Sequence, residues 1–131
     1  MQLSDADKIR DQYDAVNERD WARAMRHYGD DVELVIPSAG FLVAGTFHGR
    51  DAVGRWFGDW FGTFDRDIHF DTREVTELAD GSYLIVADVE ARGRTSGAAA
   101  STTVFWVYRF RDGKVAHLEY FPSREEAVAG R

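Results

Sequence analysis

The stretch 99–121, AASTTVFWVYRFRDGKVAHLEYF, decides the fold because it holds two strand-like segments joined by a tight turn. Segments 99–111 and 115–121 are rich in β-branched and aromatic residues, which favour strands. Asp112-Gly113 lies between them, and an Asp-Gly pair readily adopts the positive backbone angles of a two-residue hairpin turn. The stretch therefore predicts an antiparallel hairpin.

Two further strand-like segments, 67–78 and 82–95, precede this hairpin. Asp80-Gly81 separates them, and Ser96-Gly97 separates the second from the hairpin. Three successive hairpins make a four-stranded antiparallel meander. Upstream, segment 32–36 reads as one more strand, which ends at Pro37, and 38–48 is predicted to be a loop.

Helices are predicted before and after the first strand in the sequence. Ser4 caps a helix that ends near residue 17, and Asp20 caps a short second helix that 29–31 should end. Apolar residues spaced three and four apart make 50–64 an amphipathic third helix, and Ser123 caps a short last one. The inner face of the second helix is predicted to carry Trp21, Ala24, Met25 and Tyr28.

These elements predict an α+β fold with a cone-shaped pocket. A curved antiparallel sheet, the four-stranded meander plus the N-terminal strand, is expected to wrap over three helices. The length of 131 residues suits a single domain, 1–131, with one core.

Composition excludes several classes of function. The net charge is −7, which opposes binding to nucleic acid or to an anionic membrane. The chain has no Cys, and its four His are not clustered, so neither a metal nor another cofactor is expected. No signal peptide or long apolar span is evident, which predicts a cytoplasmic protein. Aromatic residues make up 14% of the chain, enough to line a cavity as well as a core.

Side-chain alternation assigns the faces of the strands. On 82–95 the inward positions include Ala87, Ala91 and Gly93, whose small size leaves space that either a cavity or large side chains from other elements would occupy. Strand 99–111 is apolar on both faces, since Phe105 and Val107 lie opposite its inner side. Because the predicted elements leave no second layer for the outer face, a second subunit is expected there, forming a homodimer.

The chain resembles the nuclear transport factor 2-like superfamily, which includes ketosteroid isomerases and SnoaL-like polyketide cyclases. The resemblance covers nearly the whole chain and implies one SnoaL-like domain, a cystatin-like α+β barrel. Its markers, in order, are YGDDV at 28–32, FHGRDAV at 47–53, DGKV at 112–115 and YF at 120–121.

The catalytic residues of ketosteroid isomerases do not carry over. The resemblance places their general base, an Asp just before the strand-ending Pro, at Ile36. It places their oxyanion donors at Gln12 and Trp106, while Tyr13 is one residue away and Tyr28 matches a supporting Tyr. Without a carboxylate at residue 36, steroid isomerase activity is not expected.

Few other side chains could serve as an acid or a base. The resemblance to SnoaL-like cyclases implies an inward carboxylate or His, but Asp88, Glu90 and Arg92 alternate outward as a charged ladder. His117 and Glu119 could form an acid–base pair only if a bulge reversed their strand. The catalytic candidates are therefore Tyr13, Tyr28 and His117.

The inward groups suit a small, apolar, ring-containing molecule with one or two oxygens, although each could instead be packed within the core. Two functions fit this pattern: a SnoaL-like enzyme, such as a cyclase or isomerase, or a non-catalytic ligand-binding or dimerisation domain. The residues expected to contact the ligand are Gln12, Tyr13, Tyr28, Ile36, Trp56, Trp60, Trp106, Tyr108, Leu118 and Tyr120.

Overall fold

One mixed sheet organises the chain, with strand order β2-β1-β6-β5-β4-β3. The structure is a computed structural model that describes residues 3–37, 44–62, 68–92 and 99–129, with the backbone alone at 60–62, 91–92 and 99–100. Neighbouring strands are antiparallel except β1 and β6, which are parallel. The strands are β1 (Tyr28–Ile36), β2 (Gly45–His48), β3 (His69–Glu77), β4 (Tyr83–Arg92), β5 (Ala99–Arg111) and β6 (Lys114–Phe121).

The predicted meander is confirmed as β3 to β6. Asp112 and Gly113 both have positive φ, 53° and 77°, as the β5–β6 turn requires. Gly81 supplies the positive φ in the turn between β3 and β4. The Ser96-Gly97 turn lies outside the described residues.

Two predictions about the first half of the chain are wrong. Residues 29–31 do not end a helix, because β1 already begins at Tyr28, which pairs with Val115 of β6. Within the predicted loop 38–48, β2 pairs with β1 and makes the sheet one strand larger than expected. The sheet is an open one, since β2 and β3 form its two edges, rather than a closed barrel.

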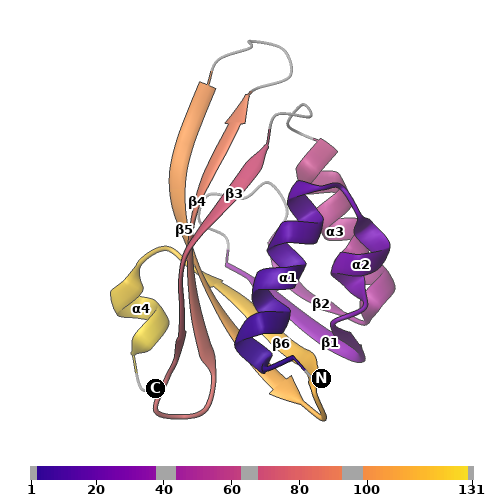
Figure 1. The fold of residues 1–131 in the computed structure, drawn as a ribbon, viewed down its shortest axis with the longest axis vertical. Coiled ribbons are helices and arrows are strands. Elements are labelled where there is room, and N and C mark those ends of the chain that lie inside the picture. Colours follow the sequence, from indigo (N-terminus) through magenta and orange to yellow (C-terminus); the bar gives the residue numbers. More distant parts are fainter. Residues whose placement is uncertain (1–2, 38–43, 63–67, 93–98, 130–131) are drawn as a thin grey trace.

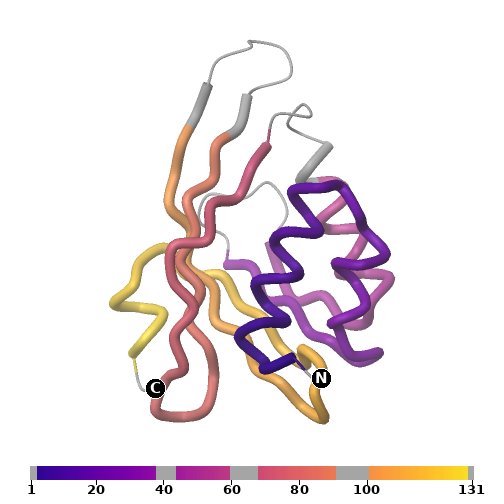
Figure 2. Tube along the Cα trace, viewed as in Figure 1, coloured from indigo at the N-terminus to yellow at the C-terminus, as the bar shows by residue number. Residues whose placement is uncertain are grey.

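Three helices, α1 (Asp5–Asn17), α2 (Trp21–Met25) and α3 (Arg50–Gly62), lie on one side of the sheet (Figure 1). The predicted caps are confirmed, since the side chain of Ser4 accepts a hydrogen bond from the Asp7 N–H and that of Asp20 from the Arg23 N–H. The start of α1 lies beside the β5–β6 turn (Figure 2), where Lys8 Nζ donates to the Gly113 carbonyl at 2.8 Å.

The main hydrophobic core fills the space between these helices and the concave side of the sheet. The alternation predicted for β4 is confirmed, because Ile85, Ala87 and Val89 belong to this core. Asp88 points to the other side, where it bonds Arg73 and Thr103.

A second, smaller core lies on the opposite face and corrects one expectation. Helix α4 (Arg124–Val128), capped by Ser123 as predicted, packs there through Ala127 (Figure 1). Its partners are Leu84, Val86 and Val107, so the chain itself supplies the layer that was assigned to a second subunit. A five-residue helix is too short to show an amphipathic period, which is why its position was not foreseen.

Candidate functional site

A cavity of about 50 Å³ lies between the three helices and the concave side of the sheet. Helix α2 covers it on the solvent side, because Trp21 lines the cavity and is also 43% exposed. Trp21, predicted on the inner face of this helix, therefore lies at the edge of that face, where it borders both the cavity and solvent. The described lining residues are Gln12, Tyr13, Val16, Trp21, Ala24, Met25, Tyr28, Trp56, Phe57, Phe70, Val104, Trp106 and Tyr108.

Helix and strand periodicity bring these side chains together. Gln12, Tyr13 and Val16 occupy one face of α1, at successive spacings of one and three residues. Every second residue of the middle of β5 faces them, namely Val104, Trp106 and Tyr108. The walls are therefore mainly aromatic, and the Trp106 ring packs on Phe57 with centroids 6.2 Å apart.

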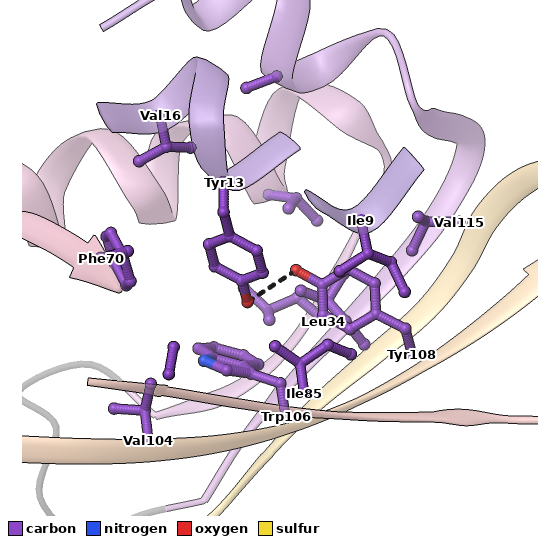
Figure 3. Packing of buried hydrophobic residues seen from close by; sticks show 14 of the residues in the cluster. Ile9, Tyr13, Val16, Leu34, Phe70, Ile85, Val104, Trp106, Tyr108 and Val115 are labelled. Atoms are coloured by element: carbon purple, nitrogen blue, oxygen red, sulfur yellow. Dashed lines mark hydrogen bonds between the residues drawn. The ribbon is translucent and has the colours of Figure 1, made fainter. Parts of the chain in front are cut away.

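A row of buried polar groups crosses the deep side of the cavity. Tyr13 reaches from α1 toward the sheet and meets Tyr108 there (Figure 3), where the Tyr108 hydroxyl donates to the Tyr13 hydroxyl at 3.2 Å. Gln12 Nε2 donates to the Tyr28 hydroxyl. The Tyr28 and Tyr108 hydroxyls also interact, so one continuous polar row joins Gln12, Tyr28, Tyr108 and Tyr13.

Burial determines the protonation state of the tyrosine hydroxyls in this row. Removal from water raises the pKa of Tyr13, Tyr28 and Tyr108 above the ordinary value of a tyrosine. All three hydroxyls stay protonated at neutral pH and can act as hydrogen-bond donors or weak acids, not as bases. Among the described lining residues there is no Asp, Glu or His that could take a proton instead.

One polar atom of the row lacks a partner. Gln12 is only 5% exposed, yet its Oε1 accepts no hydrogen bond from the part of the chain that the structure describes. Nearly all buried side-chain oxygens in native proteins have a donor. Gln12 is therefore the residue of this site whose hydrogen-bonding capacity is unfilled.

The residues named from the sequence fall into three groups. Gln12, Tyr13, Tyr28, Trp56, Trp106 and Tyr108 line the cavity. Ile36 and Leu118 are buried in the adjoining core, and Tyr120 packs edge-on against Trp106 with ring centroids 5.4 Å apart. The side chain of Trp60 lies outside the described residues.

His117 lies away from the cavity. A bulge does occur in β6, but it falls between Val115 and His117, so Val115 and Leu118 both face the core and His117 faces outward. There the His117 Nδ1 lies 2.8 Å from Glu33 Oε1, and its Nε2 lies 3.3 Å from Glu119 Oε1. As an inward acid or base, His117 is therefore ruled out.

Several lining residues were not named as ligand contacts. Ala24 and Met25 were already assigned to the inner face of the second helix, and Phe57 shares the apolar face of α3 with Trp56. Phe70 comes from an edge strand, and its ring lies 5.5 Å from that of Tyr13, centroid to centroid. Only the pairing of distant segments brings Phe70 and Val104 to the same cavity.

No three or more His, Asp or Glu side chains in the described ranges are grouped so that they could hold a metal ion. Among the described helices, none is both long enough and apolar enough to cross a membrane.

Comparisons with solved structures show the same fold in proteins of low sequence identity. Bal32a, from a soil-derived mobile gene cassette, is 20% identical with a TM-score of 0.79, over 89% of this chain and 87% of that one. TerC, co-crystallised with polyporic acid, is 21% identical with a TM-score of 0.77, over 90% and 91%. A Mycobacterium tuberculosis protein in complex with estradiol-17beta-hemisuccinate is 15% identical with a TM-score of 0.75, over 94% and 97%.

The sequence comparisons give the family without giving a function. No curated protein matches the chain. The family model described as the SnoaL-like domain matches residues 9–118, which is most of the chain. The fold, the match and its extent agree, and the chain belongs to the SnoaL-like domain family.

Proposed function

We propose that this protein binds a small, apolar, ring-containing molecule in the cavity beneath α2. The observation that carries the proposal is the pairing of aromatic walls with a single row of buried hydroxyls. Aromatic walls offer dispersion contacts and ring-edge interactions to a flat ligand, and a few polar groups fix its orientation. Two of the similar structures, TerC and the Mycobacterium tuberculosis protein, hold small molecules, which supports the same use here.

The cavity must enlarge to hold even a single ring. Its volume of about 50 Å³ is small beside the roughly 150 Å³ of an engineered cavity that takes up benzene. Met25 can rearrange at little cost because its side chain is unbranched. Trp21 borders solvent, so outward movement of α2 is the shortest way to open the space. Single-ring compounds should therefore bind with the least rearrangement.

The binding experiment uses a panel of one- and two-ring apolar compounds. Binding should change tryptophan fluorescence, since Trp21, Trp56 and Trp106 line the cavity, and should raise the melting temperature. The Ala24→Phe variant should lose binding because Ala24 lines the cavity, is 3% exposed, and its replacement fills the space. The control Ala22→Phe, on the exposed face of the same helix, should bind as wild type does. Unchanged fluorescence and melting temperature across the whole panel would refute the proposal.

Any catalysis would rest on the tyrosine hydroxyls. Tyr13 and Tyr28, held protonated by burial, could donate hydrogen bonds to an oxygen that gains negative charge during a cyclisation or isomerisation. The cavity would supply the rest by holding reacting groups close together. Isomerisation of steroid enones is not expected, because Ile36, in the core, cannot accept a proton.

The alternative is a non-catalytic ligand-binding or dimerisation domain. The lack of a carboxylate or imidazole among the described lining residues favours this alternative. A reaction abolished by Tyr13→Phe, with ligand affinity retained, would favour the enzyme.

We also propose a homodimer formed through the outer face of the sheet. Helix α4 covers Val107, but Phe105 and Phe121 beside it remain only half-buried. Partly exposed aromatic side chains of this kind are typical of protein interfaces.

A further inference from the structure

The Gln12 carboxamide is held deep in the site by one of its two polar atoms. Its Nε2 donates to the Tyr28 hydroxyl, and the residue is 5% exposed. Its Oε1 is buried and accepts no hydrogen bond from the described residues. A buried acceptor without a donor is destabilising, and water or a ligand that donates to it would relieve the cost.

The neighbouring hydroxyls do not satisfy this oxygen. The Tyr108 hydroxyl donates to Tyr13, and the Gln12 amide interacts with it as a donor. The Tyr28 hydroxyl accepts from Gln12 Nε2 and interacts with Tyr108. The other residues that line the cavity beside Gln12 are mostly apolar. Because Gln12 itself lines the cavity, a molecule bound there that reaches this oxygen can supply the missing donor.

We propose that the ligand carries a neutral hydroxyl group, as a phenol or an enol does, and that Gln12 Oε1 accepts its hydrogen bond. This inference rests on the proposed function and specifies the class of ligand. The surroundings favour an un-ionised hydroxyl, since the burial that keeps the hydroxyls of Tyr13 and Tyr108 protonated acts equally on a bound phenol. A hydroxyl that keeps its hydrogen can donate it to Gln12.

The orientation of the Gln12 carboxamide determines whether the cavity selects a ligand that donates a hydrogen bond or one that accepts it. If the carboxamide were turned by 180°, Oε1 would face Tyr28 and Nε2 would lack an acceptor. The cavity would then select a ligand oxygen that accepts, such as an ether, and not one that donates. Ligands that differ only in this property therefore test the inference directly.

The experiment compares phenol, toluene and anisole on the full chain by calorimetry and ligand-observed NMR. The three share one ring, the size closest to the cavity, and differ in carrying a donor, no polar group, or an acceptor alone. Phenol should bind about tenfold more tightly than toluene, because it satisfies a buried acceptor that toluene leaves unpaired. Anisole should show no gain over toluene.

Variants assign the preference to Gln12. Gln12→Met removes both amide atoms at nearly constant shape, so the preference for phenol over toluene should disappear while toluene still binds. Asp14→Met, on the exposed face of the same helix, should keep the wild-type preference. If Gln12→Met does not fold, equal binding of phenol and toluene to the wild-type protein, or stronger binding of anisole than of toluene, would still overturn the inference.

Every other outcome overturns the inference, and one of them also counts against the proposed function. Equal binding of phenol and toluene overturns the inference and leaves the proposed function in place. Stronger binding of anisole than of toluene would show that the cavity selects a hydrogen-bond acceptor, which overturns the inference. A preference for phenol that survives in Gln12→Met would show that another residue accepts the hydroxyl, which also overturns it. Failure of all three to bind at millimolar concentration overturns the inference and counts against the proposed function as well.

Discussion

Asp11 joins the first two helices at a single carboxylate. Its Oδ1 lies 3.0 Å from Arg23 Nε, and its Oδ2 lies 2.7 Å from His27 Nε2. The Arg23 guanidinium, helped by His27, lowers the pKa of Asp11 from 3.8 to about 2. Because the pKa in the folded protein is the lower one, the stabilisation is present above pH 4 and is lost as the pH falls toward 2.

Asp11→Asn should therefore lower the free energy of unfolding by about 1 kcal/mol at pH 7, a figure reduced for partial exposure to solvent. Urea unfolding at several pH values measures this. The difference from wild type should shrink steadily as the pH is lowered from 4 toward 2. Asp14→Asn makes the same change at an exposed position of the same helix and is the control. A constant difference at all pH values would mean that the charge of Asp11 contributes nothing.

Helix α4 stabilises the fold by covering the outer face of β4 and β5. Ala127 is 0% exposed and packs against Leu84, Val86 and Val107. Because Ala127 is fully buried in this contact, the larger Leu side chain should strain the packing, and Ala127→Leu should cost about 1–3 kcal/mol of stability. Ala22→Leu makes the same change on the exposed face of another five-residue helix and should alter stability by less than about 0.5 kcal/mol.

Equilibrium unfolding in urea compares these two variants. Equal, small effects would show that α4 does not hold its position in solution. That result would leave Leu84, Val86 and Val107 exposed and would restore the earlier expectation that a second subunit covers them.

At the scale of the whole molecule, the oligomeric state tests the proposed interface on the outer sheet face. A homodimer is expected at micromolar protein concentration, measured by sedimentation velocity. Phe105→Lys should convert the dimer to a monomer. Phe105 is a partly exposed residue of β5 beside α4, and a charge there opposes burial between subunits. Leu3→Lys, which changes a side chain that is 45% exposed at the start of the chain, should remain dimeric. A monomeric wild-type protein would contradict the prediction.

The aromatic cavity was partly predictable, because its residues follow local periods. Gln12 and Tyr13 share a face of α1, Trp56 follows the apolar spacing of α3, and Trp106 and Tyr108 alternate along β5. Phe70 was not predicted to line the cavity, because no local sequence pattern indicates that its strand forms a wall of the cavity. His117 remained ambiguous because a bulge can be placed before or after it, and only the pairing of β6 with β1 and β5 fixes the bulge before it.

Local signals in the chain were sufficient for the helix caps at Ser4, Asp20 and Ser123, the Asp-Gly turns and the meander, because these depend on residues within a few positions of one another. Contacts between distant segments decide the rest. The strand β2, the parallel pairing of β1 with β6, the side of the sheet that α4 covers, and the unfilled oxygen of Gln12 all depend on partners far along the chain. Backbone pairing and burial are satisfied over the whole sheet at once, so a short segment such as β2 carries too little local preference to reveal its role.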